Sequence, residues 1–311
     1  MIVNKDSIQE RPSMAAPDLR SDLDLTLDEL QQLLQLAADV KRAPGRFSTA
    51  LQGQALSLLF EKPSLRTRLT FELAIQQLGG YAVTSIGMIG DREPLKDMAR
   101  NLDRWTQGIV ARVFAQSTIE GLAEWSRVPV INALSDLYHP CQALADVQTI
   151  QERFGRFEGL KLAYVGDGNN VAHSLMLTAG RLGMHVAVAT PTGYEPNAAI
   201  VAQARAHGAA ITVTNAAAEA AKGAAAVYTD VWASMGQEAE AEERKRIFAP
   251  YQVNSALMAH AAPDAIFLHC LPAKRDQEVT DSVMESSQSA IFDQAENRLH
   301  AQKALLLMLL K

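Results

Sequence analysis

The stretch Ala55-Leu-Ser-Leu-Leu-Phe-Glu-Lys-Pro-Ser-Leu-Arg-Thr-Arg68 joins an apolar run to the start of an amphipathic segment. The run Ala55–Phe60 predicts a buried strand, and Pro63 ends it. Ser64 then stands where a helix N-cap is expected, because its hydroxyl can accept from a free backbone N–H group. The residues expected on the buried face of that helix are Phe71, Ala74, Ile75 and Leu78. The stretch therefore predicts a strand–loop–helix unit.

Apolar runs of this kind recur along the chain and alternate with helical patterns. The predicted strands are Ala55–Phe60, Tyr81–Ser85, Gly108–Phe114, Val128–Ile131, Leu160–Val165, His185–Ala189, Ala210–Val213, Ala225–Tyr228 and Ala265–Leu268. Such alternation predicts an α/β fold with parallel sheets and helices on both faces. Nine strands are many for one sheet, and they divide into four before His139 and five after it. We therefore expect two doubly wound domains with the active site in the cleft between them.

The expected division places residues 1–139 in the first domain and residues 140–294 in the second. A helix over Pro140–Arg153 would link them, and a terminal helix over Glu296–Leu310 would return to complete the first domain with residues 295–311. Near the N-terminus, Thr26 is expected to cap a helix. The apolar stripe of that helix is Leu30, Leu33, Leu34 and Ala37. The residues up to about Asp22 read as a mobile tail.

Bulk composition narrows the class of protein. The 311 residues are 48% hydrophobic and 21% charged, as in globular proteins, and the net charge of −6 gives no support to nucleic-acid binding. Two cysteines, Cys141 and Cys270, form no disulfide framework and suit a reducing compartment. Residues 1–25 lack the apolar core of a signal peptide, and no run is long enough to span a membrane. These features favour a cytoplasmic enzyme.

The helix expected after Pro63 carries the strongest functional signal. Its first turn combines free backbone N–H groups and a partial positive charge with the hydroxyls of Ser64 and Thr67 and the guanidinium groups of Arg66 and Arg68. Hydroxyls and guanidinium groups bind phosphate well. An ordinary capped helix with solvated arginines is the plainer alternative.

The sequence also contains residues that could bind two other types of ligand, a metal ion or a dinucleotide. His139 and Cys141, with His269 and Cys270, could bind a metal, but their spacings match no structural zinc pattern. The loop Gly166-Asp-Gly-Asn-Asn170 resembles a dinucleotide-binding turn, but Val171 stands where the third glycine would be. We therefore expect neither a metal nor a cofactor.

Seven blocks resemble motifs of the aspartate/ornithine carbamoyltransferase family, and the resemblance runs from about Leu23 to Leu310. The blocks are Ser64-Leu-Arg-Thr-Arg68, Ala111-Arg-Val-Phe114, His139-Pro-Cys-Gln142, Gly166-Asp-Gly-Asn-Asn170, Asp230-Val-Trp-Ala-Ser-Met-Gly236, His269-Cys-Leu-Pro272 and Asp293-Gln-Ala-Glu-Asn-Arg-Leu-His300. The resemblance implies transfer of a carbamoyl group from carbamoyl phosphate to the side-chain amine of L-ornithine in arginine metabolism, with biosynthesis favoured. It also implies a homotrimer built on the carbamoyl phosphate domains.

The resemblance further implies the roles of individual residues. Catalysis would rest on Arg112, His139, Asp230 and Cys270. Carbamoyl phosphate would be bound by Ser64, Leu65, Arg66, Thr67, Met88, Arg112, His139, Gln142, Cys270, Leu271 and Arg298. Ornithine would be bound by Asn170, Asp230, Ser234 and Met235.

Two positions depart from the family pattern. Leu65 replaces a threonine that contributes largely its backbone N–H group, and Met88 replaces the Gln or His of many relatives in a loop that reaches a neighbouring subunit's site. Two alternatives stay open. N-acylornithine carbamoyltransferases lack the Ser-Met-Gly block, and the acetylornithine type carries Lys at the position of Glu278. A catalytically silent paralogue is the alternative from another class.

Overall fold

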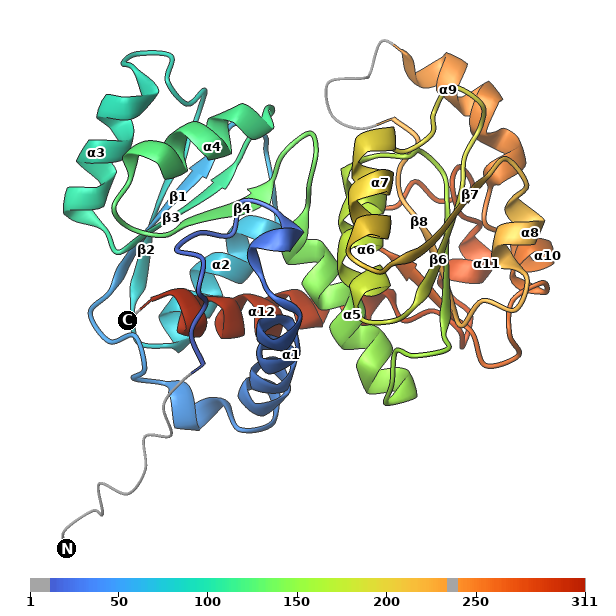
Figure 1. Ribbon diagram of the computed structural model, residues 1–311, viewed down its shortest axis with the longest axis horizontal. Coiled ribbons are helices and arrows are strands. Elements are labelled where there is room, and N and C mark those ends of the chain that lie inside the picture. The colour runs from blue at the N-terminus through green and yellow to red at the C-terminus, as the bar shows by residue number, and fades with distance from the viewer. Residues whose placement is uncertain (1–11, 234–239, 311) are drawn as a thin grey trace, which may run out of the picture.

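A computed structural model describes residues 12–233 and 240–310 of the chain. Two parallel sheets lie side by side, with helix α5 (Pro140–Phe154) between them (Figure 1). The first sheet has four strands in the order β2-β1-β3-β4, and the second has five in the order β7-β6-β5-β8-β9. The seven pairs of neighbouring strands in these sheets are all parallel. The expected α/β fold and its division into four and five strands are confirmed.

The strands form where the apolar runs predict them, although several ends shift by a few residues. In the first sheet they are β1 (Ala55–Phe60), β2 (Tyr81–Ile86), β3 (Gly108–Arg112) and β4 (Val130–Leu134). In the second they are β5 (Lys161–Val165), β6 (His185–Ala189), β7 (Ala210–Thr214), β8 (Ala226–Thr229) and β9 (Ile266–His269). Every residue of β1 is buried, as expected for a central strand with helices on both faces.

Helices cover the two sheets. In the first half of the chain they are α1 (Leu27–Arg42), α2 (Arg66–Gln77), α3 (Leu95–Trp105) and α4 (Gln116–Trp125). After α5 come α6 (Asn170–Arg181), α7 (Ala198–Ala206), α8 (Ala217–Ala221), α9 (Ala241–Phe248), α10 (Ser255–Met258), α11 (Asp281–Met284) and α12 (Ile291–Leu309). Thr26 caps α1 in a capping box with Glu29, and the predicted apolar stripe of α1 is buried.

Helices α5 and α12 tie the two halves of the chain together. Pro140 opens α5, and Gly155 closes it with a φ of 69°, a conformation that glycine adopts without steric cost. Helix α12 begins at Ile291, earlier than predicted, and packs against α1, α2 and α5. Its second half is almost wholly buried and apolar, so the end of the chain contributes to the core beside the first sheet.

The N-terminal segment differs from expectation. Residues 12–22 are not a mobile tail, because Leu19 exchanges backbone hydrogen bonds with Val130 and Asn132 on β4. Farther along, the buried carboxylate of Asp22 accepts hydrogen bonds from Ser174 (2.6 Å) and Thr178 (2.8 Å), both on α6. The sequence alone did not predict that Asp22 connects this segment to α6, because its hydrogen-bond partners come from the other half of the chain. Within the described residues, no helix is long and apolar enough to cross a membrane.

Candidate active site

A cavity of about 680 Å³ lies where the carboxyl ends of strands from both sheets meet. This edge is where parallel α/β sheets bind ligands. Most of the residues predicted from sequence line it. They are Ser64, Leu65, Arg66, Thr67, Arg112, His139, Asn170, Asp230, Cys270, Leu271 and Arg298. The structure thus brings together side chains that lie more than 200 positions apart in the chain.

Two predicted residues, Gln142 and Met88, do not line this cavity. Gln142 is buried behind it, where its Oε1 accepts a hydrogen bond from Nη1 of Arg298 (2.6 Å). The exposed side chain of Met88 lies elsewhere, on the loop after β2. Ser234 and Met235 lie outside the described residues.

Helix α2 presents an uncapped N-terminus to the cavity. The prediction that Ser64 caps this helix is wrong: the helix begins at Arg66, Leu65 occupies the cap position, and no side chain makes a cap hydrogen bond. The first N–H groups of the helix therefore keep their capacity to bind an anion, and the hydroxyl of Ser64 is left beside them. The predicted buried face of the helix is confirmed by Phe71, Ala74 and Ile75.

The guanidinium groups of Arg66, Arg112 and Arg298 face the same cavity from three different elements. None of them forms an ion pair with a carboxylate among residues 12–233 and 240–310. Burial, helped by the charge of Arg298, lowers the pKa of Arg112 to about 10. A buried cation without a counter-ion is unfavourable, so this end of the cavity is suited to a ligand with more than one negative charge.

Local irregularity in the sheet positions Arg112. The pairing of β3 with β4 shifts register between Ala111 and Arg112, so that Arg112 lies opposite Leu134 rather than the next residue after Asn132. Such irregularities re-aim side chains at the edges of sheets. The Nε atom of Arg112 is buried with no partner in the described part of the chain, as expected of a group that awaits a ligand.

His139 stands at the N-cap position of α5, on the floor of the cavity. Burial lowers the pKa of His139 well below its ordinary value, and the charges of Arg298 and Arg112 lower it further. The imidazole is therefore neutral at pH 7. A neutral imidazole has one N–H group to donate, which suits the predicted hydrogen bond to a carbonyl oxygen.

The opposite wall of the cavity is acidic. Asp230 follows β8, and its carboxylate accepts hydrogen bonds from the thiol of Cys270 (3.0 Å) and from Nδ2 of Asn169 (2.8 Å). The loop before α6 thus uses its two asparagines differently. Asn169 caps α6 and holds Asp230, whereas Asn170 lines the cavity and donates to the carbonyl of Ser135 (2.7 Å).

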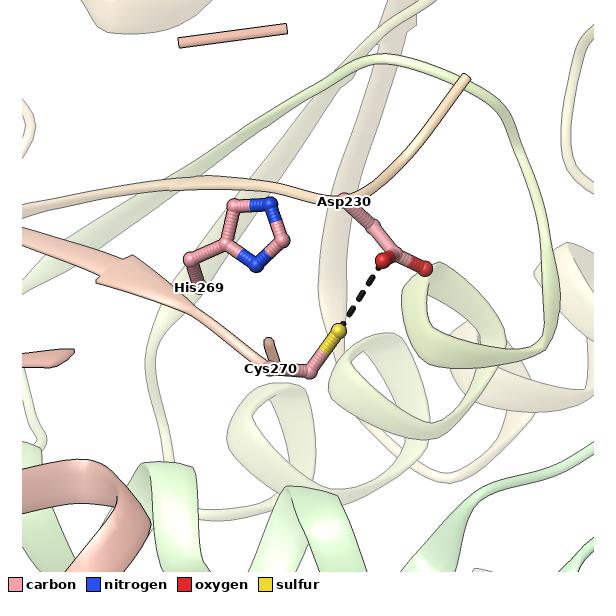
Figure 2. A group of neighbouring side chains, drawn as sticks. All are labelled: Asp230, His269 and Cys270. Carbon is pink, nitrogen blue, oxygen red and sulfur yellow. Dashed lines mark hydrogen bonds between the residues drawn. The ribbon is translucent and has the colours of Figure 1, made fainter. Parts of the chain in front are cut away.

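Asp230, His269 and Cys270 offer three ligand-type atoms within 4.8 Å of one another (Figure 2). His269 is already occupied, since Nδ1 accepts from the N–H group of Leu271 (2.8 Å) and Nε2 lies 3.2 Å from the buried carboxylate of Glu278. A metal would have to break one of these contacts. The thiol donates to Asp230 instead, so hydrogen bonding accounts for the cluster (Figure 2).

Leu271 holds a strained conformation at the edge of the cavity. Its φ of 58° lies in the left-handed region, which costs a residue with a side chain about 1–2 kcal/mol. The hydrogen bond from Leu271 to His269 holds this turn in place. Residues of this kind cluster at functional sites.

Sequence reasoning missed Lys62, Lys274 and Asn169. Lys62 and Lys274 line the cavity, and the Nζ atom of Lys62 lies 4.4 Å from the ring centre of Phe114. Asn169 lies inside a block that the sequence singled out, and Lys62 and Lys274 each lie two residues from one, so nearness to a motif was the available signal. Only the fold shows which neighbours of a motif face inward.

Family models match nearly the whole chain. One described as the carbamoyl-P binding domain of aspartate/ornithine carbamoyltransferase matches residues 18–152, and one described as the Asp/Orn binding domain matches residues 158–309. The chain belongs to the aspartate/ornithine carbamoyltransferase family. In this carbamoyltransferase, α2 and Arg112 fall within the first match, whereas Asn170, Asp230 and Cys270 fall within the second.

Individual relatives are similar over almost their full length. A Thermococcus kodakarensis protein named ornithine carbamoyltransferase is 50% identical over 96% of this chain and 98% of its own. A Pyrococcus furiosus protein named ornithine carbamoyltransferase, anabolic, is 48% identical over the same shares. The solved structure of ornithine carbamoyltransferase from Pyrococcus furiosus superposes with a TM-score of 0.92 at 48% identity, covering 96% of this chain and 98% of that one.

The protonation of Cys270 in this carbamoyltransferase gives a testable prediction. Burial raises the pKa of the Cys270 thiol well above its ordinary value, and the charge of Asp230 raises it further. Asp230→Asn removes that charge, so the pKa should fall. Alkylation by iodoacetamide at pH 8 should then become about tenfold faster for each unit of the fall.

The measurement is the rate of Cys270 labelling between pH 6 and pH 10, followed by mass spectrometry in both proteins. Cys141 is the internal control, because burial raises its pKa to about 12 and it should stay unlabelled. A labelling profile that is unchanged, or that moves to higher pH in the variant, would contradict this assignment.

Proposed function

We propose that the protein transfers the carbamoyl group of carbamoyl phosphate to the side-chain amine of L-ornithine, forming citrulline and phosphate. One observation carries the proposal. Guanidinium groups that form no ion pair within residues 12–233 and 240–310, together with a helix N-terminus, face a carboxylate and a thiol across a single cavity of about 680 Å³. A doubly charged phosphate suits the first wall, and an ammonium group suits the second.

At the cationic wall, Ser64, Arg66, Arg112 and Arg298 would hold the phosphoryl group. The carbonyl oxygen of carbamoyl phosphate would lie among Thr67, Arg112 and His139, where negative charge develops as the amine attacks. Groups fixed in place before the reaction stabilise such charge without further reorganisation. We further propose that carbamoyl phosphate binds first and helps to order the site for ornithine.

At the acidic wall, the reacting amine must lose a proton. By analogy with lysine, its pKa in water is near 10.4, so at pH 7 it is mostly an inert ammonium. Asp230 would receive the ammonium, and removal from water would favour the neutral amine. Because the pKa of the Cys270 thiol is raised, the thiol stays protonated and acts as a hydrogen-bond donor rather than a nucleophile. Asn170 would bind the carboxylate of ornithine.

The reaction balances without a metal or cofactor. The amine nitrogen forms a bond to the carbonyl carbon, the bond from that carbon to the phosphate oxygen breaks, and the proton released by nitrogen leaves with phosphate. Holding both reactants in one cavity can itself lower the barrier by about 7–11 kcal/mol. The 48% identical relative from Pyrococcus furiosus is named as an anabolic enzyme, which supports a role in arginine biosynthesis.

The division of labour follows the two sheets. We assign carbamoyl phosphate binding to residues 1–139 with the C-terminal residues 295–311, and ornithine binding to residues 140–294. Helix α12 supports this assignment, because Arg298 reaches the phosphate wall while the end of the helix packs beside the first sheet. We place the reaction in the cytoplasm, since Cys141 and Cys270 are both free thiols.

An exposed apolar surface supports a homotrimer built on the first sheet. Its members are Leu65 at the start of α2, Leu69 and Leu73 on α2, and Val83, Ile86 and Met88 on and after the edge strand β2. Surfaces of this kind mark protein–protein contacts. Sedimentation equilibrium should give the mass of three chains, and Val83→Lys should lower it. A monomeric wild-type protein would refute the trimer. It would also refute the predicted place of Met88 near a neighbouring subunit's site, because that prediction requires the trimer.

Arg112 gives a kinetic prediction. Arg112→Ala removes a donor to both the developing oxyanion and the leaving phosphate, so kcat should fall by about 100- to 1,000-fold. The fold should persist, because the guanidinium has no described protein partner to lose. Steady-state kinetics with circular dichroism would measure both effects. Arg127→Ala, on the exposed surface, is the matched control. A near-normal kcat for the Arg112 variant would refute its assignment.

Substrate choice tests the proposed function directly. Purified protein with carbamoyl phosphate should form citrulline from L-ornithine and no product from N-acetylornithine or N-succinylornithine, because their acyl group occupies the α-amine, next to the carboxylate that Asn170 is expected to bind. Chromatography of the products would show this. Turnover of an N-acyl derivative in preference to ornithine would overturn the assignment of the acceptor, and no turnover of any of them would favour a silent paralogue.

A further inference from the structure

Asp146 is a fully buried carboxyl group behind the cavity, and the reaction described above does not use it. It lies on α5, one turn after Gln142. Its Oδ1 accepts two hydrogen bonds, from Nε2 of Gln142 (2.7 Å) and from Nε2 of Gln294 on α12 (2.6 Å). The other oxygen, Oδ2, has no partner in the described part of the chain. An acid in such a place is costly unless its contacts serve a purpose.

One of these hydrogen bonds leads to the cationic wall. Because Nε2 of Gln142 donates to Asp146, the amide oxygen must face the other way, where it accepts from Nη1 of Arg298 (2.6 Å). Nη2 of Arg298 in turn donates to Oγ1 of Thr67 (2.9 Å) in the first turn of α2. The orientation of Gln142 thereby sets the position of a guanidinium that lines the phosphate end of the cavity.

The second hydrogen bond leads to the acidic wall. Nε2 of Gln294 also lies 3.2 Å from the hydroxyl of Tyr228, and its Oε1 accepts from the backbone N–H group of His269 (2.9 Å). Both ends of the Gln294 amide are engaged, so only one orientation satisfies its partners. This bond fixes the backbone directly before Cys270, which in turn contacts Asp230.

We propose that Asp146 is a positioning residue that holds both walls of the active site in register through Gln142 and Gln294. The inference rests on the proposed function, because it concerns the geometry of that reaction. The two walls are built around different sheets, and a misplacement of about 1 Å between reacting groups can cost about 100-fold in rate. Because both walls are connected to the same acceptor atom, Oδ1 of Asp146, their relative displacement is restricted.

The role requires an acceptor oxygen rather than a charge. Burial raises the pKa of Asp146 to about 7, while the hydrogen bonds from Gln142 and Gln294 and the charge of Arg298 act in the opposite direction. A proton on Oδ2 leaves Oδ1 able to accept both hydrogen bonds. An asparagine can present its amide oxygen in the same place, so Asp146→Asn should retain the geometry that Asp146→Ala loses.

The experiment compares Asp146→Ala, Asp146→Asn and a control, Thr149→Val, by steady-state kinetics and thermal unfolding. Thr149 lies on the same helix and is also buried, and its hydroxyl bridges Ala145 to Asn297 of α12 without reaching the cavity. We expect Asp146→Ala to lower kcat by about 100-fold and to raise KM for both substrates. Asp146→Asn should restore most of the activity. Thr149→Val should lower stability and leave kcat unchanged.

Three results would overturn the inference: a folded Asp146→Ala protein with near wild-type kcat, an asparagine variant as inactive as the alanine one, or an equal loss of kcat in Thr149→Val. If Asp146→Ala does not fold, Gln294→Leu tests the positioning role instead. This variant removes only the hydrogen bonds that connect Asp146 to His269 and leaves those through Gln142. It should raise KM for ornithine and spare KM for carbamoyl phosphate, and unchanged kinetics would refute the role.

Failure of the proposed function can be distinguished from failure of the positioning role. If the wild-type protein forms no citrulline, that result counts against the function alone. Calorimetry with carbamoyl phosphate, comparing wild type with Asp146→Ala, then judges the positioning role through the Gln142 branch. Equal affinities would overturn it, and a weaker variant would support it.

Discussion

Positive charge that no ion pair balances within the described residues is the constraint on which the rest of the structure depends. Arg66, Arg112 and Arg298 converge where α2 begins, and the helix N-terminus adds its own partial positive charge. Gathering these groups raises the free energy of the protein until an anion binds. A bound phosphoryl group therefore balances the positive charge of this wall. The fold positions the cationic groups before the ligand binds.

Each half of the chain supplies what the other lacks. The first sheet carries the cationic wall at the ends of β1 and β3, and the second carries Asp230 and Cys270 at the ends of β8 and β9. Neither wall alone could hold both an anion and an ammonium group at reacting distance. Helices α5 and α12 cross between the sheets, and Asp146, Gln142 and Gln294 form hydrogen bonds where these helices meet. The boundary between domains is thus also the base of the site.

Periodicity and strand-end motifs predicted much of this from sequence, for physical reasons. Apolar runs identify parallel strands because both faces are buried, and polar residues after such runs lie at one edge of a sheet. The predictions were wrong where contacts distant in sequence determine the local structure. Ser64 looks like a helix cap but makes no cap hydrogen bond. Residues 12–22 look like a tail, but Leu19 forms hydrogen bonds with β4 and Asp22 forms them with α6. Asn169 and Asn170 are neighbours in sequence, and only the fold separates their roles.

A crystal structure with both products, phosphate and citrulline, would test the central claim most directly. We expect phosphate within hydrogen-bonding distance of the first turn of α2 and of Arg66 and Arg112, and the ureido group of citrulline beside Cys270 in the same cavity. Phosphate bound away from α2, or the two products in separate pockets, would contradict a shared site built on unpaired arginines.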